Sequence, residues 1–147
     1  MYNTTMSLSE SFIQIALFSK KLLARFSEKY DLTHQQVVLL HNIPTLDGIS
    51  ISELSNRLGV DISTLSRNLK KMEEKKLTTR SKCVNDNRVY KVFITTKAEE
   101  IVSLVLNDFD LSMSKILDSM QLSTSSSFTQ KIESISWELY KLTNDKK

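Results

Sequence analysis

A short stretch of the chain combines a hydroxyl, a guanidinium and two ammonium groups on one face of a predicted helix that runs from 62 to about 76. At 100° per residue, the apolar side chains of this segment share the other face and are expected to pack against the preceding helices: Ile62, Leu65, Leu69 and Met72. The polar set points outward: Ser63, Arg67, Lys70 and Lys71. Such a set can read base edges and neutralise phosphates. Arg67 is the predicted base contact, because its planar fork pairs bidentately with guanine.

The alternative for this helix is a solvated basic face, because charge patterns on helices are weak evidence by themselves. The distribution of charge along the chain favours the nucleic-acid interpretation. Residues 61–97 contain ten Lys or Arg and four Asp or Glu, so this segment carries a net charge of +6. The whole chain carries +3, so the remainder carries −3. A basic segment in an otherwise slightly acidic chain is typical of a phosphate-facing surface.

The composition predicts one soluble, mainly helical domain. The 147 residues are 40% hydrophobic and 25% charged, and they include only two Gly and one Pro. So few chain-breaking residues exclude an all-β fold and favour long helices. No signal peptide and no apolar run long enough for a bilayer is visible, so we expect a cytoplasmic protein without a membrane partner. The single cysteine, Cys83, cannot form an internal disulfide, which agrees with a reducing compartment.

Capping signals place two short helices directly before the basic one. Helical periodicity predicts a first helix over 8–30, and Thr33 with Gln36 forms a capping box for a second helix that Pro44 stops near 43. Ser50 with Glu53 predicts a further capping box, for a helix that ends at Gly59. Asp61 is then the N-cap of the basic helix. Two helices joined this closely form a helix-turn-helix.

The segment after the basic helix changes period. Residues 90–94 alternate in the manner of a strand, and the three residues Asn85, Asp86 and Asn87 supply a turn before them, which predicts a β-hairpin over about 77–95. A long helix follows up to Met120, and a short Ser/Thr loop over 123–127 precedes the last helix. That helix has apolar residues at heptad-like spacing: Phe128, Ile132, Ile135, Leu139 and Leu142.

Together these pieces resemble the MarR family of bacterial winged helix-turn-helix regulators over nearly the whole chain. The resemblance is carried by the run ISELSNRLGV at 51–60, by Ser63-Thr64 with Arg67, by Leu77 with Arg80, by Asp86-Asn87-Arg88, and by VFIT at 92–95. It departs from the family pattern at Lys76, where a Gly often stands, at Asn87, where a second wing Arg is common, and at Ala98, where a Gly often follows Thr-Lys. Losing one wing Arg predicts weaker phosphate contact by the wing.

The resemblance implies a mainly α fold with a small β-hairpin wing, in one domain over 1–147. The winged helix-turn-helix would span about 33–97, and helices at about 7–30 and 97–145 would form a homodimer. Each chain would place a recognition helix in the major groove of a palindromic double-stranded DNA site, with Arg88 in the minor groove and Asp86 holding it. A narrow minor groove favours such an Arg, and a plain turn with a surface ion pair is the alternative. The implied DNA-binding set is Ser52, Ser63, Thr64, Arg67, Lys70, Lys71, Arg80, Asp86 and Arg88.

The resemblance also implies control of DNA affinity, in a repressor, by a small-molecule effector bound between the dimerisation helices and the winged domain. The candidate lining residues are Phe18, Leu22, His41 and Phe109, although such apolar stripes more often form core. Cys83 offers an alternative, a thiol-based redox-responsive regulator, because some family members sense oxidants through a cysteine; an inert thiol is the simpler interpretation.

Other functional classes find little support in the sequence. His34 and His41 are two helical turns apart, about 10.5 Å, which is too far to share a metal ion. We therefore expect no metal and no cofactor, a structural role for His34, and no enzyme activity, because no nucleophile elbow, phosphate loop or paired-cysteine motif occurs. A winged helix that binds a protein partner without DNA is the remaining alternative.

Overall fold

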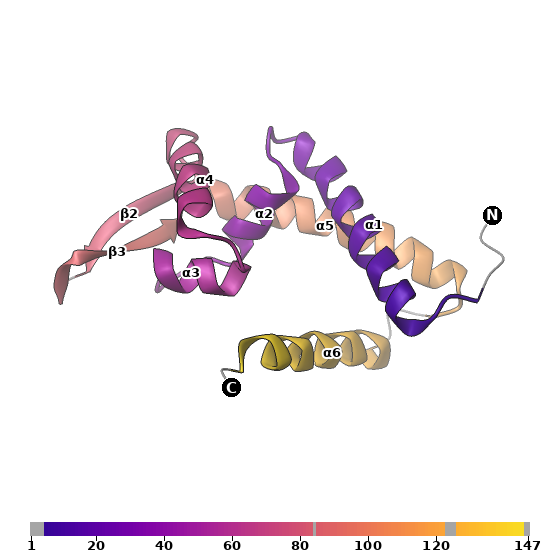
Figure 1. The fold of residues 1–147 in the computed structure, drawn as a ribbon. Coiled ribbons are helices and arrows are strands. Elements are labelled where there is room, and N and C mark those ends of the chain that lie inside the picture. Colours follow the sequence, from indigo (N-terminus) through magenta and orange to yellow (C-terminus); the bar gives the residue numbers. More distant parts are fainter. Residues whose placement is uncertain (1–4, 84, 123–125, 146–147) are drawn as a thin grey trace. The chain divides into compact units, whose positions relative to one another are not determined.

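The computed structural model describes residues 5–83, 85–122 and 126–145, and the described chain is mainly helical with a small antiparallel sheet (Figure 1). The predicted fold class is confirmed. The elements follow in the order α1 (Leu8–Glu28), α2 (His34–His41), β1 (Ile49–Ser50), α3 (Ile51–Leu58), α4 (Ile62–Glu74), β2 (Thr78–Cys83), β3 (Asp86–Ile94), α5 (Thr96–Ser119) and α6 (Ser126–Asn144).

Short polar side chains start the helices, as their spacing predicts. The Thr33 hydroxyl accepts a hydrogen bond from the Gln36 N–H at 3.2 Å, and the Gln36 side chain accepts from the Thr33 N–H at 3.1 Å. At α3 the Ser50 hydroxyl accepts from the Glu53 N–H at 3.1 Å, but the Glu53 side chain does not accept from the Ser50 N–H, so only half of the predicted capping box forms. These bonds satisfy amide groups that have no partner within a helix. Because they involve residues only three positions apart, the sequence is sufficient to predict them.

Several helices end with a residue in the left-handed backbone conformation. Gly59 has φ +64° after α3, as predicted for a glycine cap. After α4 the same conformation is adopted by Lys76, at φ +59°, and the Leu77 N–H donates to the Met72 carbonyl at 2.8 Å. Glycine adopts this backbone conformation without steric cost, whereas a residue with a Cβ does not. The structure thus accounts for the Gly that the family pattern often has at Lys76.

The sheet has three strands in the order β1-β3-β2, one more than the predicted hairpin. Ile49 pairs with Val92 on one side of β3, and Arg80 pairs with Val92 on the other. Gly48 permits the close approach of β1, because a Cβ there would lie 2.7 Å from the Val92 carbonyl oxygen and its φ is +63°. Strand β3 already begins at Asp86, so the predicted turn over 85–87 is too long. A two-residue strand leaves no period in the sequence, which is why β1 was missed.

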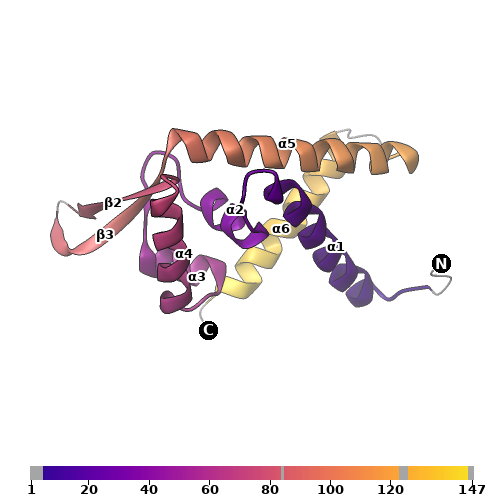
Figure 2. The same ribbon diagram turned by 90° about the horizontal axis from the view of Figure 1, so that it is seen from above.

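The chain divides into two compact units, Met1–Asn107 and Asp108–Lys147, and the boundary falls inside α5. In the first unit a continuous core joins α2, α3, α4, the sheet and the start of α5, and its fully buried side chains include Leu40, Leu54, Leu65, Leu69 and Val92. Both views show the β2–β3 hairpin extending beyond α3 and α4 (Figures 1 and 2). The core therefore holds α4 and the base of the hairpin, and it leaves the outer face of each accessible.

Large apolar side chains remain exposed on the helices outside this core. On α1 they include Phe12, Ile13, Ile15 and Phe18. On α6 the predicted apolar seam is exposed at Ile132, Ile135, Leu139 and Leu142, while Phe128 is half-buried. Helix α6 includes Ser126 and Ser127, so the predicted Ser/Thr loop is shorter than expected at its end; residues 123–125 lie outside the described part of the chain. Among the described residues, no helix is both long enough and apolar enough to span a membrane.

Candidate nucleic-acid interface

Helices α3 and α4 are joined by a tight turn that hydrogen bonds fasten to α3. The Ser55 hydroxyl donates to the Val60 carbonyl at 2.6 Å, and the Val60 N–H donates to the Ser55 carbonyl at 3.2 Å. The Arg57 guanidinium donates to the Asn42 carbonyl at 3.1 Å, which ties α3 to the end of α2. These hydrogen bonds hold the end of α3 to the turn and to α2, and apolar packing places α4 against the core.

Three of the four apolar residues predicted for the inner face of α4 are buried: Leu65, Leu69 and Met72. The fourth, Ile62, was predicted to pack against the preceding helices, and this prediction is wrong because its side chain is 55% exposed. Ile62 is the first residue of α4, where the helix leaves the turn before it reaches the core. Helical period alone cannot show where along a helix the packing begins.

The opposite face of α4 presents the predicted polar set to solvent. Ser63, Arg67, Lys70 and Lys71 are all exposed, and Thr64 is half-buried. The Arg67 Nη2 donates to the Thr64 hydroxyl oxygen at 3.4 Å, so the guanidinium lies along the first turns of the helix. Ser52 is exposed on α3. This face of α4 therefore carries hydroxyls, one guanidinium and two ammonium groups along a length of about two turns.

The N-cap Asp61 organises the first turn of this face. Its Oδ1 accepts from the Thr64 hydroxyl at 2.7 Å, its Oδ2 accepts from the Thr64 N–H at 3.0 Å, and the same Oδ2 accepts from the Ser63 hydroxyl. These bonds, of which the one from Ser63 has the largest effect, hold the pKa of the Asp61 carboxyl well below its usual range. Asp61 was predicted only as a helix cap; its bonds to both hydroxyls were not foreseen.

Arg80, on β2, is held by an acidic residue of α4. Its Nε donates to Glu73 Oε1 at 2.6 Å, and each side chain is about one-third exposed, 34% for Arg80 and 33% for Glu73. Phosphate oxygens and carboxylate oxygens compete for the same guanidinium donors. In this structure Glu73 therefore occupies one of the donors with which Arg80 would contact a phosphate.

Removing that carboxylate gives a first testable prediction. Glu73→Gln is expected to raise affinity for duplex DNA by about two- to fivefold at low salt, since one acid near the phosphates is lost and Arg80 is released. Fluorescence anisotropy titrations at several salt concentrations would measure it. Glu74→Gln changes the net charge equally at the next position and is the matched control. An equal gain in both variants would show that net charge alone is responsible.

The wing adds further cations beyond α4. Arg88 is exposed on β3, and the Lys82 ammonium lies 5.9 Å from the centroid of the Tyr90 ring. The side chains of Cys83 and Asp86 lie outside the described part of the structure, so the predicted pairing of Asp86 with Arg88 and the predicted thiol chemistry stay predictions. The described wing nevertheless presents Arg88 and Lys82 on exposed strand positions.

Of the four predicted effector residues, three belong to the first unit: Phe18, Leu22 and His41. His41 lines a recess of about 390 Å³ between α2, β3 and α5, together with Glu99, Val102 and Leu106. Phe18 is half exposed and Leu22 is half-buried on α1, and neither lines this recess. Phe109 belongs to the second unit.

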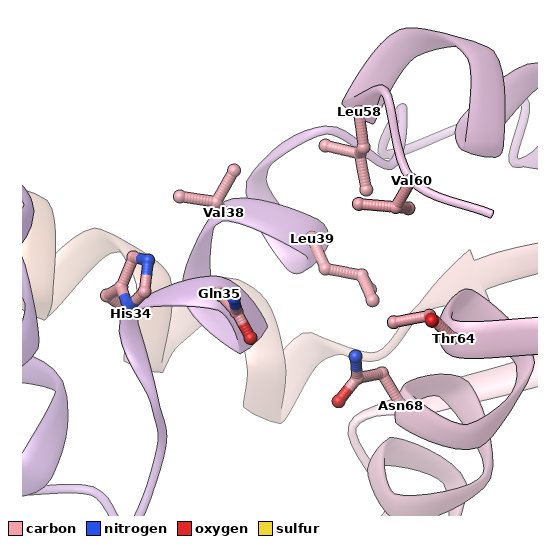
Figure 3. A pocket seen from close by; sticks show the side chains of 8 residues that line it. All are labelled: His34, Gln35, Val38, Leu39, Leu58, Val60, Thr64 and Asn68. Carbon is pink, nitrogen blue, oxygen red and sulfur yellow. The ribbon is translucent and has the colours of Figure 1, made fainter.

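A second cavity, of about 260 Å³, lies behind the turn between α3 and α4 and was not predicted (Figure 3). Figure 3 shows apolar side chains from α2 and the turn, with Thr64 and Asn68 of α4 at one side. The other lining residues are His34, Gln35, Val38, Leu39, Leu58 and Val60. Burial, and secondarily the charge of Lys20, lowers the pKa of His34. A neutral imidazole at pH 7 agrees with the structural role expected of His34.

With this geometry established, comparison with known proteins shows which family the chain resembles. The model of the MarR family matches residues 32–90, which include α2, the α3–α4 pair and most of the wing. Over these residues the chain is similar to the MarR family. This similarity agrees with the family resemblance that the sequence predicts.

Three known proteins are similar to this chain. The chain is 28% identical over 110 residues to the HTH-type transcriptional regulator SarZ of Staphylococcus saprophyticus, a match that covers 68% of this chain and 75% of SarZ. A crystal structure of MarR superposes with a TM-score of 0.82 at 21% identity and covers 99% of each chain. A point mutant of S. aureus MepR bound to an oligodeoxyribonucleotide superposes with a TM-score of 0.64 at 26% identity, over 94% of this chain and 99% of MepR.

Proposed function

We propose that this protein regulates transcription as a homodimer that binds palindromic duplex DNA, with α4 in the major groove and the wing in the minor groove. The observation that carries the proposal is the exposed face of α4, where Ser63, Arg67, Lys70 and Lys71 point away from a buried apolar face. An α-helix fits the major groove, and these side chains can reach base edges and phosphates together. The oligodeoxyribonucleotide bound to the MepR mutant supports DNA as the partner.

The exposed apolar residues of α1 and α6 support the homodimer. Soluble monomers rarely leave so many large apolar side chains in contact with water. On α6 four of them, Ile132, Ile135, Leu139 and Leu142, lie on one helix face, which suits packing against another helix. A two-fold dimer would present two α4 helices, and a site with two-fold symmetry would then be required.

The same proposal includes repression under control of a small molecule. A dimer that occupies a promoter excludes polymerase from it, so we propose a repressor. We assign the effector site to the recess at His41, which lies between α2 and α5. Helix α5 begins the segment at about 97–145 that is predicted to form the dimer. A ligand that changes the angle between these helices would change the spacing of the two α4 helices.

The experiment that tests the proposal selects DNA from a random-sequence pool with the wild-type protein. We expect enrichment of an inverted repeat and an affinity that falls by about 10³-fold between 50 and 200 mM salt, given six or more phosphate contacts per dimer. Sedimentation of the complex would give two chains per site. Failure to enrich any sequence, or binding that salt does not change, would contradict the proposal and favour a protein partner.

A further inference from the structure

The first turn of α4 has its hydroxyl protons already engaged before any DNA is bound. An ionised carboxylate can only accept hydrogen bonds, so the Ser63 and Thr64 hydroxyls must both donate to Asp61. Each hydroxyl has a single proton and two lone pairs. A third donor, the Thr64 N–H, is taken by the same carboxylate at 3.0 Å. The side of the helix N-terminus that usually attracts phosphates therefore faces an anion here.

The hydroxyls of Ser63 and Thr64 differ in their remaining hydrogen-bonding capacity. Thr64 is half-buried and its oxygen already accepts from Arg67 at 3.4 Å, which leaves it little capacity. Ser63 is exposed, and its two lone pairs are its remaining hydrogen-bonding capacity. A free serine hydroxyl can contact either a donor or an acceptor on DNA. The bond to Asp61 removes that choice at Ser63.

We propose that Ser63 reads DNA only as an acceptor, and that it thereby selects an adenine or a cytosine through its exocyclic amino group. In the major groove these amino groups are the only base donors, whereas guanine N7 and O6, thymine O4 and the phosphates are all acceptors. Asp61 acts as a positioning residue, since its carboxylate determines the polarity of the contact without touching the base. The inference rests on the proposed function, because it requires α4 in the major groove.

The hydrogen bonds from Ser63 and Thr64 hold the pKa of the Asp61 carboxyl well below its usual range, so the carboxylate accepts these bonds in its ionised form at neutral pH. The chemistry also complements Arg67, which only donates and therefore prefers guanine. Successive turns of α4 would thus read bases of opposite hydrogen-bonding character.

The test uses the duplex that wild-type protein selects, with single-base analogues in each half-site. Purine in place of adenine, or 2-pyrimidinone in place of cytosine, deletes one amino group. At one position of the half-site, this deletion is expected to weaken binding of the wild-type protein by about fivefold. The same deletion is expected to weaken binding of Ser63→Ala by less than about twofold, because alanine makes no hydrogen bond to the amino group. The matched controls delete acceptors instead, with 7-deazapurines for N7 and methylphosphonates for phosphate oxygens.

The variant Asp61→Asn tests the role of the carboxylate. Asparagine caps a helix as well as aspartate does. Its NH₂ group can only donate, so one hydroxyl that donates to Asp61 in the wild type would accept a hydrogen bond in the variant. Preference for the amino-bearing base is expected to fall toward that of Ser63→Ala, with an unchanged far-ultraviolet circular dichroism spectrum.

The inference would be overturned if Ser63→Ala changed the effect of deleting an acceptor, or if it changed the effect of no analogue at all. Either result would still leave the protein bound to DNA. If wild-type protein selects no DNA, the proposed function fails first and this inference fails with it. The two failures are therefore distinguishable.

Discussion

Arg67→Ala is expected to weaken binding to the selected DNA by about 10- to 100-fold and to abolish the preference for guanine at one position of each half-site. A bidentate contact between arginine and guanine contributes about 1–3 kcal/mol of discrimination. The structure gives this residue an exposed position on α4 and a bond from its Nη2 to Thr64, which leaves its other donors available for a base edge. Anisotropy titrations against every single-base variant of the site would measure both effects.

Two further variants separate base reading from charge. Arg67→Lys keeps the charge but loses the planar fork, so it should recover much of the affinity and little of the specificity. Lys70→Ala removes a charge from the same face and should weaken binding to all sequences equally, with a salt slope smaller by about one. If Arg67→Ala behaved like Lys70→Ala, Arg67 would be a phosphate contact and the base contact would have to be reassigned.

Ile135→Asp together with Leu139→Asp is expected to convert the homodimer into monomers and to reduce DNA affinity by more than about 100-fold. Each substitution would bury a carboxylate in an apolar interface without a partner, which costs several kcal/mol. The loss of DNA binding follows because one α4 helix per particle contacts only half of a palindromic site. Analytical ultracentrifugation would measure the mass, and anisotropy the affinity.

Gln130→Asp is the matched control for this pair, since it places a carboxylate on the other side of α6, away from the apolar seam. It should leave both mass and affinity unchanged. A double variant that remains a dimer would move the interface to other exposed residues, of which those on α1 are the next candidates. A monomer that binds the full site with wild-type affinity would contradict the proposed two-fold mode of recognition.

The features that the sequence predicted correctly all depend on residues close together in the chain. The caps at Thr33 and Asp61 need a partner only three positions away, and Gly59 needs only its own backbone conformation. The outward face of α4 follows from its period, because three buried apolar residues determine which side turns away from the core. The exposed polar face of α4 is therefore predictable from the sequence alone.

Other features depended on segments that approach one another only in the folded chain. Strand β1 exists because Gly48 lets it reach Val92, and Glu73 meets Arg80 because β2 returns alongside α4. The period of α4 gave no reason for Ile62 to be exposed, since burial depends on where the neighbouring helices end.

The polar side chains of the basic helix show which properties the sequence determines and which the fold determines. Residue types and helical period alone determined that Ser63, Arg67, Lys70 and Lys71 share a face, because a helix repeats every 3.6 residues whatever surrounds it. Only the tertiary structure determined which donors and acceptors of those groups remain available for DNA. Asp61 engages the protons of two hydroxyls and Glu73 occupies Arg80, and both contacts depend on side-chain directions and distances that no spacing in a sequence specifies.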